Sequence, residues 1–238
     1  MDGAQREILA GNLKRVRERI AAACLRVKRD PREVTLVAVT KSVGPEVMQA
    51  LIELGVTDIG ENRLQAAKEK FPQVPGLWDR TRVKRHFIGH LQTNKVKSVL
   101  ELFDVIHSVD SLKLAEEIDR RARQLELPTV AAFIEVNVSG EESKQGLPAA
   151  EFRAFFMQAL RLTHLEWQGL MTMAPLAEEA ESVRPLFRRL REMASPFSGD
   201  EALLRLASLS MGMSNDFEVA IEEGATHVRI GTALFEGM

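Results

Sequence analysis

The chain has 238 residues, of which 45% are hydrophobic and 28% are charged. This composition is typical of a globular protein with a large core, and it argues against disorder, collagen-like repeats or a coiled coil over the whole chain. The net charge of -2 and the sequence pI near 6.3 provide no general basic surface, so we expect neither nucleic acid nor a membrane as a partner.

The opening residues and the cysteine count bear on the cellular compartment. Cys24 is the only cysteine and cannot form an intramolecular disulfide, and the first ten residues carry charges where a signal peptide needs an apolar stretch. No apolar run approaches the roughly 18 to 20 residues needed to span a bilayer. These features predict a cytoplasmic protein.

Taken in chain order, the first element is an amphipathic pattern over residues 4–29, which Asp30-Pro31 ends, so we expect an opening helix there. Short β-branched runs then alternate with helical stretches such as PEVMQALIELG, SLKLAEEIDRRARQLE and AEFRAFFMQALRL. The expected strands are VTLVAV from Val34, VTDIG from Val56, KRHFIG from Lys84, FDVIHS from Phe103, TVAAFIEVNV from Thr129, LEWQGLM from Leu165, RLASLSM from Arg205 and THVRIG from Thr226.

About eight apolar strands that alternate with helices favour a parallel sheet covered on its outer side. We therefore predict a single (β/α)8 barrel, of the TIM type, that spans residues 1–238 as one domain. The competing fold is an open doubly wound sheet, but no G-x-G-x-x-G follows the first strand. No linker rich in Pro, Gly or Ser divides the chain.

In such a barrel the functional residues lie where strands end, and Lys41 directly follows the first expected strand. A lysine with an ordinary pKa near 10.4 is neutral in about one molecule in 2,500 at pH 7, so a Schiff-base lysine needs desolvation or a neighbouring cation. This position could supply both, because Lys41 would point into the barrel mouth and Arg229 would approach from the adjacent eighth expected strand. The alternative is a solvated lysine at the start of a loop.

The segments after the seventh and eighth expected strands indicate an anion site. Many barrels bind phosphate at this place, where Ser214 and Thr232 offer hydroxyl groups and Gly231 permits close backbone approach. Helices expected to begin near Asn215 and Ala233 would direct free N–H groups at the anion. The alternative is that Ser214 only caps the following helix and Gly231 only eases a turn.

Other polar residues at strand ends are less specific. A lone histidine such as His90 is more often structural than catalytic, and Asn62 and Asn137 are also common turn residues. The methionines Met171 and Met211 are most simply apolar lining. The five histidines show no H-E-x-x-H or Cys/His pairing, so we expect no metal.

Several segments in this order resemble the pyridoxal phosphate homeostasis protein family, which is related by fold to the amino-terminal barrel of bacterial alanine racemase. The segments are AVTKSV, IGENRLQ, HFIGHLQTNK, HSVDS, EVNVSGEESKQG, GLMTMAP and LSMGMSNDFEVAIEEGATHVRIGTALF. The resemblance implies that pyridoxal 5'-phosphate (PLP) is the cofactor. It implies PLP-binding residues at Lys41, Asn62, His90, Ser108, Asn137, Met171, Ser210, Met211, Ser214, Arg229, Gly231 and Thr232.

By the same resemblance Lys41 would form the Schiff base, the 210–214 and 231–232 segments would hold the phosphate, and Arg229 would face the pyridine nitrogen. A cation there disfavours protonation of the ring and makes it a poorer electron sink. The related racemases also take a proton-transferring tyrosine from another domain and subunit, and this chain contains none. We therefore predict PLP buffering or delivery, with little racemase activity and no catalytic residue.

Two alternatives remain open at this point. One is a PLP enzyme of narrow amino acid specificity, with His90 as a proton acceptor. The other keeps the barrel and the lysine but replaces PLP with a phosphorylated sugar, as in Schiff-base aldolases. PLP-requiring apoenzymes are expected as transient partners, and the absence of an unusually long apolar stripe favours a monomer.

Overall fold

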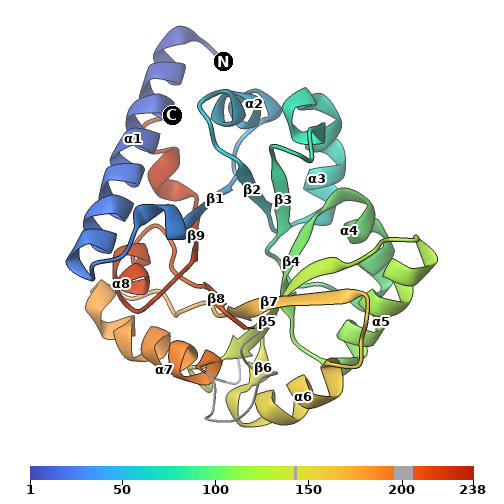
Figure 1. The fold of residues 1–238 in the computed structure, drawn as a ribbon. Helices are drawn as coiled ribbons and strands as arrows, with labels where there is room; N and C mark the ends of the chain where they lie inside the picture. Colours follow the sequence, from blue (N-terminus) through green and yellow to red (C-terminus); the bar gives the residue numbers. More distant parts are fainter. Residues whose placement is uncertain (142–143, 196–205) are drawn as a thin grey trace.

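The structure of the chain is a computed structural model that describes residues 1–141, 144–195 and 206–238. Its strands form a sheet around a central axis (Figure 1). They are β1 (Thr35–Val39), β2 (Asp58–Glu61), β3 (Lys84–Phe87), β4 (Val105–Val109), β5 (Val130–Asn137), β6 (Leu147–Pro148), β7 (Leu165–Met171), β8 (Ser208–Ser210) and β9 (His227–Ile230).

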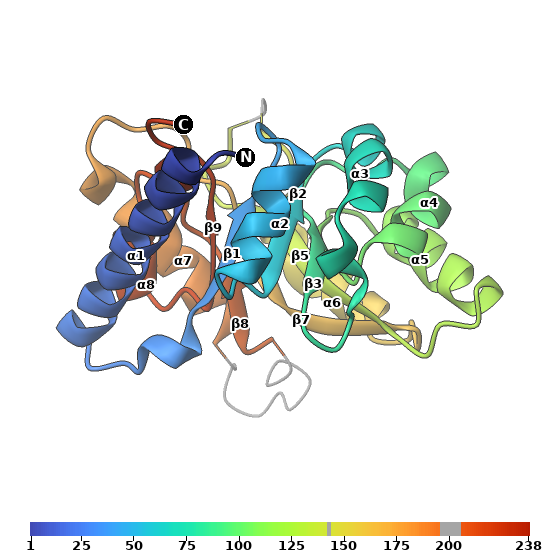
Figure 2. The ribbon, with the colours of Figure 1, turned by 90° about the horizontal axis from the view of Figure 1, so that it is seen from above.

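The sheet closes into a parallel barrel. The strands pair in the order β4-β3-β2-β1-β9-β8-β7-β5, and the additional β4–β5 pairing completes the ring. The first and last barrel strands lie side by side, with Val37 opposite Arg229 in the β1–β9 register. The predicted eight-stranded α/β barrel is therefore confirmed, and the carboxyl ends of its strands meet at one end of the molecule, the upper end in Figure 2.

Two details of the strands differ from the expectation. The seventh barrel strand, β8, is only three residues long, and Arg205, where we expected it to begin, lies outside the described residues. The two-residue strand β6 was not expected; it pairs with the end of β5 but takes no place in the barrel ring. The expected strand from Leu165 has the bounds of β7, and the ends of the remaining expected strands differ from the structure by one or two residues.

Helices surround the barrel (Figures 1 and 2). They are α1 (Gly3–Arg26), α2 (Pro45–Glu53), α3 (Leu64–Lys70), α4 (Val96–Leu102), α5 (Leu112–Gln124), α6 (Phe152–Ala159), α7 (Arg184–Ala194) and α8 (Phe217–Glu222). The opening helix α1 packs on α8 and on the carboxyl-terminal turn, where the Asn12 side-chain amide donates to the backbone oxygens of Leu234 and Glu236. No helix within the described ranges is long and apolar enough to cross a membrane.

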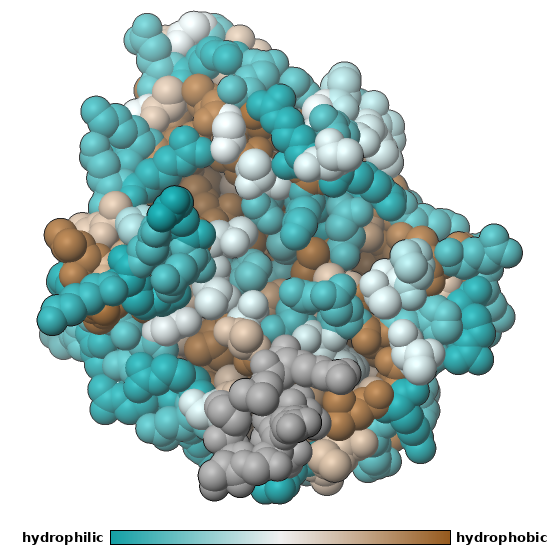
Figure 3. Space-filling model, in the orientation of Figure 1, coloured by the Kyte–Doolittle hydropathy of each residue, from teal (hydrophilic) through white to brown (hydrophobic). Residues whose placement is uncertain are grey.

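Apolar side chains fill the layer between the barrel and its helices, and teal, hydrophilic residues cover most of the face drawn in Figure 3. A small apolar cluster, formed by Val105, Phe133 and Met171, is separate from this layer. Branched apolar side chains usually fill the space inside a TIM barrel. Here much of it holds polar groups, which include His86 and His107 at about 1% and 0% exposure.

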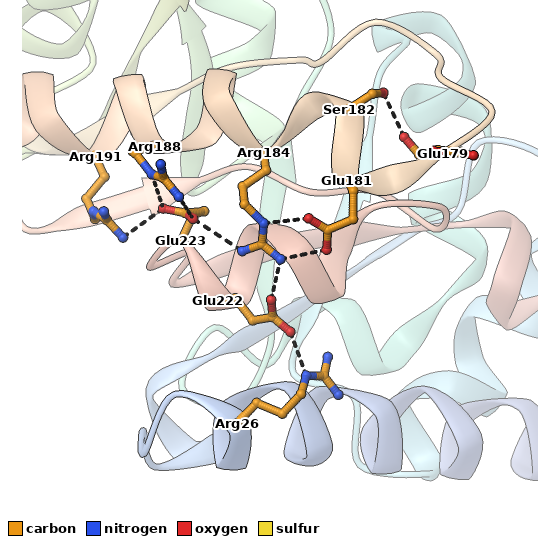
Figure 4. A network of polar contacts seen from close by, with 9 residues as sticks. All are labelled: Arg26, Glu179, Glu181, Ser182, Arg184, Arg188, Arg191, Glu222 and Glu223. Atoms are coloured by element: carbon orange, nitrogen blue, oxygen red, sulfur yellow. Dashed lines mark hydrogen bonds and ion pairs between the residues drawn. The ribbon is translucent and has the colours of Figure 1, made fainter.

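An ion-pair network fixes α7 against α8 and α1 (Figure 4). Glu222 and Glu223 lie at the carboxyl end of α8, where the helix dipole disfavours negative charge. Arginines from two other helices neutralise them, namely Arg26 of α1 and Arg184, Arg188 and Arg191 of α7. The network therefore holds the amino end of α7 and the short turn that precedes it.

Glu223 is the member whose loss should matter most, because its side chain is only 5% exposed and pairs with three arginines at 2.9–3.2 Å. We expect Glu223→Gln to lower the free energy of unfolding by about 1–3 kcal/mol, less than for a fully buried pair since the arginines are partly exposed. Urea denaturation measures this. The control Glu181→Gln alters a glutamate that is 66% exposed and should have little effect; equal midpoints for the two variants would contradict the prediction.

Candidate functional site

A cavity of about 280 Å³ opens at the carboxyl ends of the strands, near the lower limit for small-molecule sites. Residues from the ends of β1, β2, β3 and β9, from the 213–216 turn and from the segment before α7 line it. They are Val39, Lys41, Ser42, Asn62, Ile88, Met173, Pro175, Leu176, Ala177, Ala180, Val183, Met213, Ser214, Asn215, Asp216, Arg229, Gly231 and Thr232. The barrel thus brings Lys41 together with Arg229 and with the predicted anion-binding segments.

Lys41 lies two residues beyond β1, at the edge of the cavity, because β1 ends at Val39 and the chain turns before α2. Thr40, between them, is fully buried and its backbone oxygen accepts a hydrogen bond from Lys70. Lys41 itself is exposed. The expected proximity to a cavity is therefore present, but the expected desolvation of the amine by the protein is not.

Arg229 is a cation at the floor of the cavity, and its side chain is almost wholly buried. Its Nη1 donates to the backbone oxygen of Ser210 at 2.7 Å and to the Ser210 hydroxyl at 2.6 Å, and its Nη2 donates to the backbone oxygen of Thr172 at 2.9 Å. Burial lowers the pKa of Arg229 to about 10, against the opposing charges of Glu135 and Asp216. The guanidinium therefore stays charged at neutral pH.

The predicted anion-binding segments converge on one wall of the cavity. Ser214 accepts a hydrogen bond from the backbone N–H of Ala233 at 3.3 Å, which joins the two segments. The backbone N–H groups of Ser214, Asn215 and Thr232 donate to no other described residue. A Cβ atom at position 231 would lie 3.3 Å from the Val39 backbone oxygen, so glycine lets the chain after β9 lie close to β1. Free donors and hydroxyl groups thus face one space.

The elements that follow these segments are shorter than expected. The helix α8 begins at Phe217, has six residues and takes Asp216 rather than Ser214 as its N-cap residue. Only a three-residue 3-10 helix, Thr232–Leu234, follows Gly231. The donors of this wall therefore belong to tight turns, and the alternative reading of Ser214 as the cap of α8 is wrong.

Asn62 contributes an amide to the opposite side of the cavity. Its side-chain oxygen is buried and has no hydrogen-bond partner. The backbone at this point is held close to the end of β3, because a Cβ at Gly89 would lie 2.0 Å from the Asn62 carbonyl oxygen. An unpaired buried acceptor that lines a cavity is suited to a ligand donor.

The structure does not bring six of the predicted residues to the cavity wall. Ser210 and Met211 are buried and do not line it, Met211 belongs to the main apolar core, and Met171 belongs to the small separate cluster. The hydroxyl of Ser108 is buried without a partner. His90 is 45% exposed and lies 3.7 Å from Asp110, whereas the Asn137 amide binds backbone oxygens of its own loop.

The sequence interpretation missed the polar groups inside the barrel. Asp58, His86, His107 and His227 lie on strands, and Glu135 projects from β5 at 2% exposure. Burial and the charge of Asp110 raise the pKa of Glu135 to about 7, although Arg229 lowers it. The sequence signal that could have revealed these groups is the presence of polar residues within the apolar runs of the expected strands. No group of three or more potential metal ligands lies within the described residues.

Known proteins resemble this chain over nearly its whole length. The sequence matches the family described as alanine racemase, N-terminal domain, over residues 6–238. It is 44% identical over 223 residues to the pyridoxal phosphate homeostasis protein of Aquifex aeolicus, with 94% of this chain and 95% of that protein covered. The protein of the same name from Escherichia coli is 39% identical over 228 residues, with 95% of each covered. The structure of PipY from Synechococcus elongatus with PLP bound is 36% identical, has a TM-score of 0.77 and covers 92% of this chain and 99% of PipY.

The raised pKa of Glu135 makes a testable prediction for stability. Because the folded state keeps this proton up to about pH 7 and the unfolded state releases it near its ordinary value of 4.5, the free energy of unfolding should fall as pH rises between these values. Glu135→Gln should remove this slope and stabilise the protein by about 1–3 kcal/mol above pH 7. Urea denaturation at pH 5 and pH 8 measures the free energy of unfolding, with Glu166→Gln, at an exposed glutamate, as the control. An equal change in this free energy between the two pH values in wild type and Glu135→Gln would contradict the prediction.

Proposed function

The chain belongs to the pyridoxal phosphate homeostasis protein family, and we propose that it binds PLP as a Schiff base on Lys41 and buffers or delivers this cofactor. The observation that carries the proposal is that a primary amine, a buried cation and an anion-binding wall line one cavity. PLP has the complementary groups: an aldehyde, a pyridine nitrogen and a phosphate. A phosphorylated sugar would react with the amine and bind the wall through its phosphate, but it has no aromatic ring to lie beside Arg229.

The residues present fit PLP. The free backbone N–H groups of the 213–216 turn and of Thr232, with the Ser214 hydroxyl, would bind the phosphate. The unpaired Asn62 oxygen would accept a donor from the ligand or from a water molecule bound with it. Lys41 would supply the amine. Asp216 also lines the cavity, but its carboxyl oxygen already accepts from the Met213 N–H at 2.5 Å, which keeps that turn in shape.

Arg229 defines what the bound cofactor can do. When bound, PLP supplies an electrophilic carbon and, if its ring is protonated, an electron sink. In the proposed arrangement Arg229 lies at the pyridine nitrogen, and a cation there disfavours ring protonation. The chain also has no tyrosine, and the His90 imidazole is not among the residues that line the cavity. These features support binding and release over robust amino acid racemisation.

The Schiff-base assignment predicts a spectrum. Purified protein given PLP should show the absorbance band of an imine, and Lys41→Ala should abolish it because no other lysine of the described residues lines the cavity. Lys41→Arg should also lack the band although it keeps the positive charge. Lys113→Ala, which removes an exposed lysine from α5, is the matched control and should retain it. An unchanged band in Lys41→Ala would overturn the assignment.

The anion-binding wall predicts discrimination between PLP and pyridoxal, which lacks the phosphate. Ser214→Ala removes one hydroxyl and its link to the Ala233 N–H, so we expect the affinity for PLP to fall about 10-fold. The affinity for pyridoxal should stay nearly the same. Equilibrium titration of the imine band with both ligands measures this. An equal loss for both ligands would show that Ser214 does not contact the phosphate.

A further inference from the structure

A continuous chain of hydrogen bonds crosses the interior of the barrel from Arg229 on β9 to Asp58 on β2. Arg229 Nη1 lies 2.6 Å from the Ser210 hydroxyl, which lies 2.8 Å from His107 Nδ1. His107 Nε2 lies 2.8 Å from His86 Nδ1, and His86 Nε2 lies 2.9 Å from Asp58 Oδ1. Five strands, β9, β8, β4, β3 and β2, thus contribute one polar side chain each. The chain connects the cavity floor with Asp58, the first residue of β2.

The chemistry of the two ends favours one direction for the bonds. A guanidinium only donates, so the Ser210 oxygen accepts from Arg229 and its own hydrogen can point to His107 Nδ1. A neutral imidazole has one N–H, so in this arrangement His107 donates from Nε2 to His86. His86 in turn donates from Nε2 to the Asp58 carboxylate, which only accepts. All donors therefore point away from Arg229 and towards Asp58.

The charges agree with this direction. Burial, above all, holds the pKa of His107 well below its ordinary value, so its ring is neutral. Burial, the largest single effect, would raise the pKa of Asp58, but the hydrogen bonds with His86 and Thr57 and the neighbouring imidazoles together outweigh it, and the pKa is lowered. A cation and an anion thus terminate a chain of aligned dipoles, and each end stabilises the other through the groups between them.

Arg229 needs this support because its own surroundings lack a direct counter-ion. Across the described ranges of the chain, no carboxylate forms an ion pair with it. Two backbone oxygens and the Ser210 hydroxyl take its inward-facing donors. A buried cation without such partners would be strongly disfavoured. A carboxylate in contact would instead neutralise the guanidinium and weaken its interaction with a ligand in the cavity.

We propose that Ser210, His107, His86 and Asp58 are positioning residues that hold the Arg229 guanidinium, charged and in one orientation, at the floor of the cavity. The inference rests on the proposed function for its consequence, because Arg229 is the group proposed to lie at the PLP ring. It assigns a role to Ser210 different from phosphate binding. The groups act on PLP only through Arg229, so none of them is a catalytic residue.

The direction of the chain can be tested without any ligand. Long-range proton–nitrogen NMR of 15N-histidine-labelled protein at pH 7 reports which ring nitrogen carries the proton. From the hydrogen-bond geometry we expect His107 and His86 each to carry a proton on Nε2 and none on Nδ1. A proton on Nδ1 of either ring, or a doubly protonated ring, would overturn the inference whatever the protein binds.

Variants test the consequence for the cofactor. In His107→Phe an aromatic ring can keep the stacking on Phe133, whose centroid lies 4.5 Å away, but both hydrogen bonds are lost. We expect the imine band to remain, with its maximum shifted and the affinity for PLP reduced about 10-fold. His227→Phe is the matched control, since His227 lies in the same interior, with ring centroids 6.2–6.4 Å from both chain histidines, but outside the chain.

The outcomes separate the two proposals. An imine band absent from the wild-type protein would refute the proposed function, and the NMR result would still decide the direction of the chain. A band that His107→Phe and His227→Phe leave equally unchanged would refute the positioning role while the proposed function stands. If His107→Phe does not fold, Asp58→Asn replaces it: this variant keeps an acceptor for His86 but removes the charge, and it should shift the band in the same direction by a smaller amount.

Discussion

The arrangement of the site depends on a buried cation that forms no ion pair with any carboxylate in the part of the chain that the structure describes. Arg229 is only 4% exposed, and within the described residues its donors are met by backbone oxygens and one hydroxyl. Desolvating a charge in this way is unfavourable unless dipoles compensate for it. The polar interior of the barrel supplies those dipoles. Its histidines and Ser210 occupy space that apolar side chains usually fill.

This constraint also separates binding from catalysis. A cation at the cavity floor can attract and orient an anionic, aromatic cofactor, yet it works against the ring protonation that stabilises carbanions. Lys41 is exposed at the cavity edge, so the amine is accessible from solvent. An accessible lysine, a wall of free N–H donors and, in the proposed complex, a ring beside a cation are the properties expected of a protein that takes up and releases PLP.

The sequence was sufficient for the fold because strand and helix periodicities are local and strong. The eight barrel strands and the position of Lys41 after β1 follow from apolar runs and the residue that ends each run. The convergence of Ser214, Gly231 and Thr232 follows from the barrel rule that strand ends share one face. The chain of buried histidines could not be predicted, because it depends on which face of each strand points inward and on distances between side chains up to 103 residues apart. The sequence left open whether Lys41 is desolvated or solvated for a related reason, since its exposure depends on where β1 ends.

The central claim is that one specific amine carries PLP. The most direct measurement is borohydride reduction of the PLP-loaded protein, followed by proteolysis and mass spectrometry of the lysine-containing peptides. The account predicts that the peptide containing Lys41 carries the reduced cofactor, and that modification is nearly complete at this position. A cofactor attached mainly to another lysine, or no stable attachment after reduction, would contradict the account.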